Sequence, residues 1–155
     1  DPRDVMVSLF HQVTGRFNDF FNYDGDISAF IRDPYFGAGN LARFRSMWHE
    51  FRSWPNVHFT TYEEFHRDCF HALSAVLDFA NLQIPNTSIQ RAVNASTVET
   101  MREVEQSGTF PQPWLRPRNG HPKVRLGRSG TFANILTTDD ILYLNEVFRF
   151  RTEST

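Results

Sequence analysis

Apolar residues recur at helical spacing along the first part of the chain, and this periodicity is the strongest constraint on how the chain can fold. The recurring residues are Val5, Leu9, Val13, Phe17, Phe20 and Phe21. Asp1 can cap the helix, and Pro2 suits its first position, where a missing N–H costs nothing. The sequence therefore predicts a helix from residue 2 to about residue 21, with one apolar face and with Ser8 on the polar face near the start.

The rest of the chain predicts further helices and one short strand. Helices are expected over residues 27–31, 41–51, 63–79, 88–93, 98–105 and 138–148. β-Branched and aromatic residues at 57–61 favour a strand that leads into a capped helix. With 155 residues, 40% of them hydrophobic, the chain is long enough to form one domain with its own core.

The composition excludes several classes of protein. No apolar run approaches the roughly 20 residues that a membrane-spanning helix needs, and the single cysteine, Cys69, excludes an internal disulfide framework. A cytoplasmic location is expected, although sequons at Asn86 and Asn94 would permit glycosylation in the Golgi lumen. The histidines of HRDCFH fall on different helix faces and predict no metal site. The net charge of -2 argues against nucleic acid as a partner.

Positive charge gathers in a long segment rich in proline, glycine and arginine. Residues 107–130 predict a loop that exceeds the roughly 12 to 15 residues of ordinary loops, and loops of that length are usually functional or disordered. There is no acidic residue between Glu105 and Asp139. Arg125 and the backbone around Gly127 and Gly130 could therefore surround an anion, and a solvated turn is the alternative interpretation.

The start of the first helix is a second place where an anion could bind. Unpaired N–H groups and the positive end of the helix dipole lie there, together with Arg3 and Ser8. The alternative is a surface helix with a serine on its solvated face. Spacing alone leaves both interpretations open.

Four motifs, taken in order along the chain, resemble the cytosolic-type sulfotransferase family. DPRDVMVS is similar to the family's arginine-Asn/Asp-Pro-Arg/Lys-Asp-x-x-x-Ser motif without its leading arginine, and FTTYEEF is similar to its strand-end Tyr-Glu-Asp motif. NASTVETMREVE resembles Ser-Ser-Phe-x-x-Met-Arg, and VRLGRSGTFANILT resembles Arg-Lys-Gly-x-x-Gly-Asp-Trp-Lys-x-x-Phe-Thr. The resemblance implies an α/β protein. Residues 1–155 would be the helix-rich C-terminal part of a P-loop-type, three-layer sulfotransferase domain with an incomplete parallel sheet.

The resemblance also implies a donor and the residues that bind it. The family transfers a sulfuryl group from 3′-phosphoadenosine 5′-phosphosulfate (PAPS) to a hydroxyl or amine, and 3′-phosphoadenosine 5′-phosphate (PAP) is the product. Carried over by motif, the 3′-phosphate ligands are Arg3, Ser8, Arg125, Leu126 and Gly127, and the adenine contacts are Tyr62, Ser96, Thr97 and Val98. The loop 107–130 would close over the 3′-phosphate. The acceptor would be the hydroxyl of a small molecule, lipid or glycan.

The chain departs from the family pattern at several positions. Val98 replaces a phenylalanine beside the adenine, and Leu126 replaces a lysine near the phosphate. Ala133 and Leu142 stand where the family's dimerisation motif has lysine and glutamate, so that dimer contact is not supported. The family's glycine-rich phosphate loop and catalytic histidine both precede the first motif. We therefore expect no catalytic residue within this chain, and we expect an N-terminal remainder of the same protein as its partner, without which the chain would be inactive.

Two further functions remain open. Val98 and Leu126 would suit a degenerate, non-catalytic member of the family that binds an anionic ligand or partner. An arginine-rich interaction domain for nucleic acid or sulfated glycan is the other alternative, against which the net charge of -2 argues. The acceptor itself is not identified by the sequence, although aromatic residues in segments 22–40 and 107–118 would suit an apolar alcohol, phenol or lipid.

Overall fold

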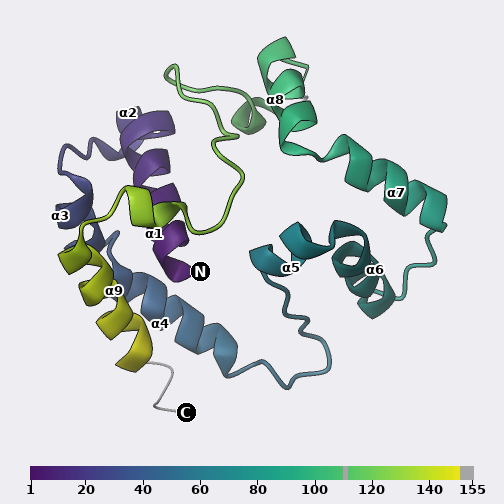
Figure 1. The fold of residues 1–155 in the computed structure, drawn as a ribbon, viewed down its shortest axis with the longest axis horizontal. Coiled ribbons are helices and arrows are strands. Elements are labelled where there is room, and N and C mark those ends of the chain that lie inside the picture. Colours follow the sequence, from purple (N-terminus) through teal and green to yellow (C-terminus); the bar gives the residue numbers. More distant parts are fainter. Residues whose placement is uncertain (110–111, 151–155) are drawn as a thin grey trace. The chain divides into compact units, whose positions relative to one another are not determined.

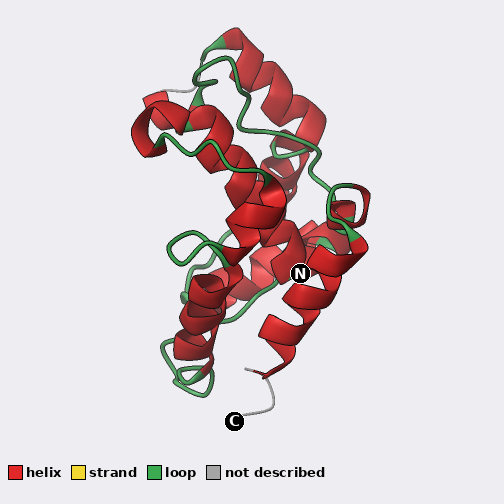
Figure 2. Cartoon of the chain, turned by 90° about the vertical axis from the view of Figure 1, so that its left-hand side faces the viewer, coloured by secondary structure: helices red, strands yellow, loops and turns green. Residues whose placement is uncertain are grey.

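The computed structural model describes residues 1–109 and 112–150, and within them the elements are helices joined by loops (Figure 1, Figure 2). No strand forms among these residues, where β-pairing is limited to an isolated antiparallel bridge between Arg118 and His121. The chain divides into two compact units. Unit 1 comprises Asp1–Phe51, Pro117–Lys123 and Arg128–Thr155, and unit 2 comprises Arg52–Arg116 and Val124–Gly127. The expected single domain over residues 1–155 stays a prediction.

Unit 1 begins with the expected helical segment, but it consists of three elements. They are α1 (Pro2–His11), the π-helical turn η1 (Gln12–Arg16) and the short helix α2 (Asn18–Phe21). Asp1 caps α1 by accepting the Arg3 N–H at 2.9 Å. In η1 the backbone of Gly15 lies against the imidazole of His121, whose Cγ would be 3.0 Å from a Cβ at position 15. A single α-helix over residues 2–21 was therefore wrong, because the π turn adds a residue to the helical repeat.

The core of unit 1 forms where α1 packs with α3 (Ile27–Arg32), η3 (Thr131–Asn134) and α9 (Thr138–Phe150), and where α4 (Ala38–His49) packs against α3 and α9. Its buried residues are Met6, Val7, Val13, Phe30, Ile31, Ala38, Leu136 and Leu144. The expected apolar face of α1 is thus rotated: Val5 is 46% exposed, whereas Met6 and Val7 are fully buried.

A buried carboxylate joins α9 to α3. Asp140 is 1% exposed, and its carboxylate accepts hydrogen bonds from Ser28 Oγ and Thr137 Oγ1, both at 2.7 Å, and pairs with Arg32 at 2.5 Å. Burial alone would raise the pKa of Asp140, but the hydrogen bonds from Ser28, Arg32 and Thr137 outweigh it and lower the pKa to about 2. Asp140 therefore stays ionised and holds α9 in place.

Unit 2 contains α5 (Tyr62–Arg67), α6 (Cys69–Phe79), α7 (Asn86–Ala95), α8 (Val98–Ser107) and the 3₁₀ turn η2 (Pro113–Leu115). A continuous helix over residues 63–79 was wrong. Asp68 leaves the helical conformation, with φ at -153°, and its carboxylate accepts the His71 N–H at 3.0 Å, which caps α6.

The expected strand at residues 57–61 does not form among the described residues. A strand needs a neighbour to pair with its backbone, and no strand of the described chain provides one. Thr61 instead forms a capping box with Glu64: Thr61 Oγ1 accepts the Glu64 N–H at 3.1 Å, and Glu64 Oε2 accepts the Thr61 N–H at 2.6 Å.

The expected loop at 107–130 begins where α8 ends, at Gly108 with φ at +67°. Residues 110 and 111 of this loop lie outside the described residues, as do residues 151–155 of the expected domain. The loop contains η2 and a tight turn at Arg118–His121, in which Asn119 and Gly120 both have positive φ. No helix in the described part of the chain is long and apolar enough to cross a membrane.

Candidate functional site

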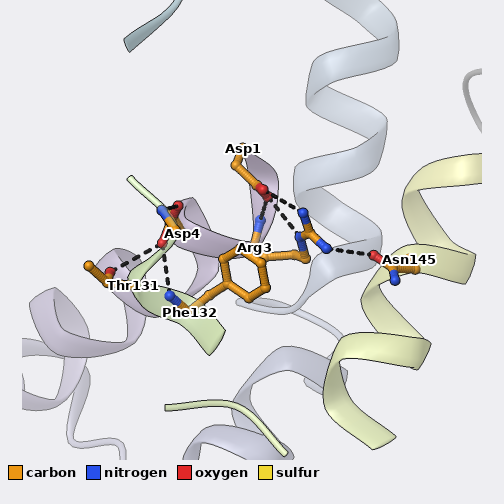
Figure 3. A network of polar contacts seen from close by, with 7 residues as sticks. Asp1, Arg3, Asp4, Thr131, Phe132 and Asn145 are labelled. Atoms are coloured by element: carbon orange, nitrogen blue, oxygen red, sulfur yellow. Dashed lines mark hydrogen bonds and ion pairs between the residues drawn. The ribbon is translucent and has the colours of Figure 1, made fainter. Parts of the chain in front are cut away.

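Helix α1 carries two of the predicted phosphate ligands, Arg3 in its first turn and Ser8 farther along. Ser8 is exposed on α1. The Arg3 guanidinium is held by its neighbours in unit 1 (Figure 3): it donates to both carboxylate oxygens of Asp1 at 3.0 and 2.6 Å and to Asn145 Oδ1 at 3.1 Å. It also lies over the ring of Phe132, 4.0 Å from the ring centroid. Arg3 is therefore fixed beside the helix start, with its side chain 28% exposed.

Asp4 connects the first motif to the last one within unit 1 (Figure 3). Its carboxylate accepts hydrogen bonds from the Gly130 N–H at 2.6 Å, the Phe132 N–H at 3.0 Å and Thr131 Oγ1 at 3.2 Å. Gly130 has a φ of +78°, which glycine adopts without strain. The carboxylate thus anchors the beginning of η3 to the first turn of α1.

One face of α8 holds the segment Val124–Gly127, which contains the other predicted phosphate ligands. Glu105, 3% exposed, accepts the Val124 N–H through Oε2 at 3.1 Å. Arg102 donates from Nη2 to the backbone carbonyl of Arg125. A Cβ on Gly127 would lie 2.4 Å from Val98 Cγ2, so the backbone at position 127 rests directly on Val98.

This arrangement leaves hydrogen-bond donors available for an anion. Within the described residues, the N–H groups of Leu126 and Gly127 have no hydrogen-bond acceptor. The Arg125 side chain is half-buried, and although burial lowers the pKa of its guanidinium, arginine stays charged in proteins. Two backbone N–H groups and one guanidinium are the chemistry that binds a phosphate oxygen.

The predicted adenine contacts lie on unit 2. Ser96 and Thr97 connect α7 to α8: Ser96 Oγ donates to the Val93 carbonyl at 3.0 Å, and Thr97 Oγ1 caps α8 by accepting the Thr100 N–H at 3.2 Å. Tyr62 is the first residue of α5, is 52% exposed, and has its ring centroid 4.3 Å from that of His66. Within unit 2 the structure thus brings Val98 together with Gly127.

Unit 2 also has a pocket of about 250 Å³, lined in part by His58, Glu64, Asp68 and His71. His71 Nδ1 lies 2.7 Å from Asp68 Oδ2, and hydrogen bonds from the backbone and side chain of His71 lower the pKa of Asp68. None of the nine residues predicted to bind PAPS lines this pocket. Among the described residues, no group of three or more His, Cys, Asp or Glu side chains could hold a metal ion.

Asp4, Arg102 and Glu105 were not among the residues expected at the site. A signal for two of them was present: Arg102 and Glu105 lie four and seven residues after Val98, which places all three on one face of the expected helix at 98–105. Asp4 stands at the aspartate of the first family motif, but its contacts were not expected, because an acidic residue in the first turn of a helix is ordinarily explained by the helix dipole.

The whole chain, residues 1–155, matches the family model described as a sulfotransferase domain. The chain belongs to the sulfotransferase family. No curated protein matches this sulfotransferase chain in sequence.

Solved structures match the whole of this sulfotransferase chain. Retinol dehydratase matches with a TM-score of 0.76 and 20% identity, in one complex with androsterone and the inactive cofactor PAP and in another with retinol and PAP. Mouse sulfotransferase SULT7A1, complexed with PAP, matches with a TM-score of 0.77 and 17% identity. The chain covers 46% of the retinol dehydratase chains and 56% of the mouse chain, and so spans about half the length of these structures. The likeness confirms the expected fold class, a helix-rich part of the sulfotransferase fold.

Proposed function

We propose that this sulfotransferase domain binds PAPS and its product PAP, and that the complete protein transfers the sulfuryl group to a hydroxyl or amine acceptor. The observation that carries the proposal is the segment Val124–Gly127, where a guanidinium and two open N–H groups are presented in the motif that resembles the family's phosphate-binding motif. The PAP bound in the retinol dehydratase and mouse sulfotransferase structures supports the same donor.

Each of the two units carries residues that the family motifs assign to the donor. Unit 1 would contribute Arg3, in the first turn of α1 where the helix dipole favours a phosphate, and the exposed hydroxyl of Ser8, farther along the same helix. In unit 2, the residues proposed to bind the 3′-phosphate are Arg125, Leu126 and Gly127. The residues proposed to contact the adenine, through ring and backbone groups, are Tyr62, Ser96, Thr97 and Val98. The proposal invokes no metal ion and no catalytic side chain from residues 1–155.

The acceptor in this proposal is an apolar alcohol or phenol, such as a lipid hydroxyl. Retinol dehydratase, which shares the fold, is solved with androsterone and with retinol. In unit 1 of the present chain, Phe20 is 75% exposed and Tyr35 is 71% exposed, and such aromatic rings suit an apolar partner. We place the reaction in the cytosol.

The test is ligand-dependent stability of the complete protein. PAP at about 100 times its Kd should stabilise the wild-type protein by about 2.7 kcal/mol, observed as a higher Tm. Ser8→Ala and Arg125→Ala should each weaken PAP binding about tenfold or more, because each removes a hydrogen bond to a charged phosphate. Ser53→Ala and Arg91→Ala, two exposed positions outside the proposed site, are the matched controls and should behave as wild type. If PAP raised the Tm of both Ser8→Ala and Arg125→Ala as much as that of the wild type, the proposed site would be refuted.

A non-catalytic anion-binding protein of the same family is the second candidate. It is favoured by Val98, which offers no aromatic face to a base, and by Leu126, which is 51% exposed and carries no charge where the family motif has lysine. The two functions differ in turnover. Transfer of labelled sulfate from PAPS to a panel of hydroxyl acceptors by the complete protein would eliminate the second candidate.

A further inference from the structure

We infer that Arg102 and Glu105 on α8 are positioning residues for the anion-binding segment Val124–Gly127, and that they set the direction of its N–H groups. The inference rests on the proposed donor binding, because it assigns a role to residues that do not themselves touch the ligand. It is carried by contacts that all lie within unit 2.

Three side chains that contact the segment lie on one face of α8. Val98, Arg102 and Glu105 follow one another at intervals of four and three residues, so their side chains form one row along the helix. Each member of the row contacts a different part of the segment: Glu105 the Val124 N–H, Arg102 the Arg125 carbonyl, and Val98 the backbone of Gly127. The helix therefore holds the segment along its whole length.

Arg102 sets the orientation of the peptide bond between Arg125 and Leu126. In a trans peptide the carbonyl of one residue and the N–H of the next point in opposite directions, and no peptide bond in the described chain is cis. Because Arg102 binds the Arg125 carbonyl, the N–H of Leu126 is turned away from α8. Arg102 also removes from the anion's surroundings a carbonyl oxygen that would repel it.

The Glu105 side chain is buried beneath the start of the segment. A carboxylate that is 3% exposed is costly unless hydrogen bonds compensate for its lost hydration, and the Val124 N–H supplies one of them. The same bond fixes the start of the segment, one residue before Arg125. With Val124 bound to Glu105 and Gly127 resting on Val98, the intervening N–H groups have little freedom to turn back towards the helix.

The experiment measures binding and local protection in the complete protein. Arg102→Ala and Glu105→Ala should each raise the Kd for PAP about tenfold by calorimetry, while leaving the Kd for adenosine 5′-phosphate, which lacks the 3′-phosphate, unchanged. Arg102→Lys and Glu105→Gln keep a donor and an acceptor, respectively, and should recover most of the affinity for PAP. Glu103→Ala, on an exposed position of α8, and Arg91→Ala are the matched controls.

Hydrogen exchange of the ligand-free protein gives a readout that does not depend on binding. The amide of Val124, whose N–H is bonded to Glu105, should exchange faster in Arg102→Ala and Glu105→Ala than in wild type, with the amides of α6 unchanged. Wild-type exchange of the Val124 amide in both alanine variants, or wild-type affinity for PAP in both, would overturn this inference and leave the donor proposal standing. An equal loss of affinity for PAP and adenosine 5′-phosphate would also overturn it, because that is the result of a general loss of structure. A wild-type protein that binds no PAP would refute the donor proposal and this role of α8 with it.

Discussion

Gly127 occupies the most sterically restricted position in the segment Val124–Gly127. Its φ is +61°, and an added Cβ would lie 2.4 Å from Val98 Cγ2. Gly127→Ala therefore combines a backbone cost of about 1 to 2 kcal/mol with a clash. We expect it to weaken PAP binding by more than tenfold, measured by calorimetry. Adding Val98→Ala should restore part of the loss, because it removes the clash and leaves the backbone cost.

Gly39 is the matched control for this substitution. It lies in α4 with open space around the position of a Cβ, so Gly39→Ala should leave PAP binding unchanged. If the Gly127→Ala/Val98→Ala double variant bound PAP no better than Gly127→Ala, contact with Val98 would not be what restricts position 127.

At the scale of residues, motif resemblance selected Val98 and Gly127 one at a time, and it could not reveal that they touch. Helical spacing assigns a residue to a face of its own helix, but a contact across 29 positions of sequence depends on how a loop returns to that helix. The same limit hid Asp4, whose three hydrogen-bond donors lie more than 120 residues away in the chain.

At the scale of elements, η3 depends on one side chain of α1. Asp4→Ala should release Gly130, Thr131 and Phe132 together, because their three hydrogen bonds share one carboxylate. We expect faster hydrogen exchange at the amides of residues 130 and 132, and a loss of about 1 to 3 kcal/mol in the free energy of unfolding by denaturant titration. Asp4→Asn keeps one acceptor oxygen and should lose less.

Glu146→Ala is the control for the change of charge, since Glu146 is exposed on α9. Wild-type exchange at residues 130 and 132 in Asp4→Ala would show that other contacts hold η3. The result bears on function, since η3 follows the segment that carries Arg125.

Most helices were predictable from periodicity and caps, and the errors have local physical causes. Residues 98–105 and 138–148 were correctly expected as helices because their apolar residues, capping residues and first-turn acids agree. The π turn at η1 was not predicted, because apolar periodicity does not distinguish a π turn from an α-helix; in the structure the backbone of Gly15 in this turn lies against His121. The break at Asp68 was missed for a different reason: an aspartate can sit within a helix or cap a new one, and only tertiary packing decides between them.

At the scale of the whole molecule, each of the two units, which the composition did not distinguish, carries residues assigned to the donor by motif. PAP added to the complete protein should therefore slow hydrogen exchange in both units: at α1 in unit 1, and at the start of α8 and residues 124–127 in unit 2. Helix α6, which carries none of the proposed ligands, should exchange at its ligand-free rate. Protection confined to one unit would show that the other contributes no ligand.

The segment at residues 57–61 has a consequence for how the protein behaves in concentrated solution. Its side chains favour β-structure, and within the described residues no strand pairs with it. A backbone of this kind is a template for the strands of other molecules, and proteins ordinarily cover such edges to prevent aggregation. Any strand that pairs with residues 57–61 would therefore also protect the protein against aggregation through this segment.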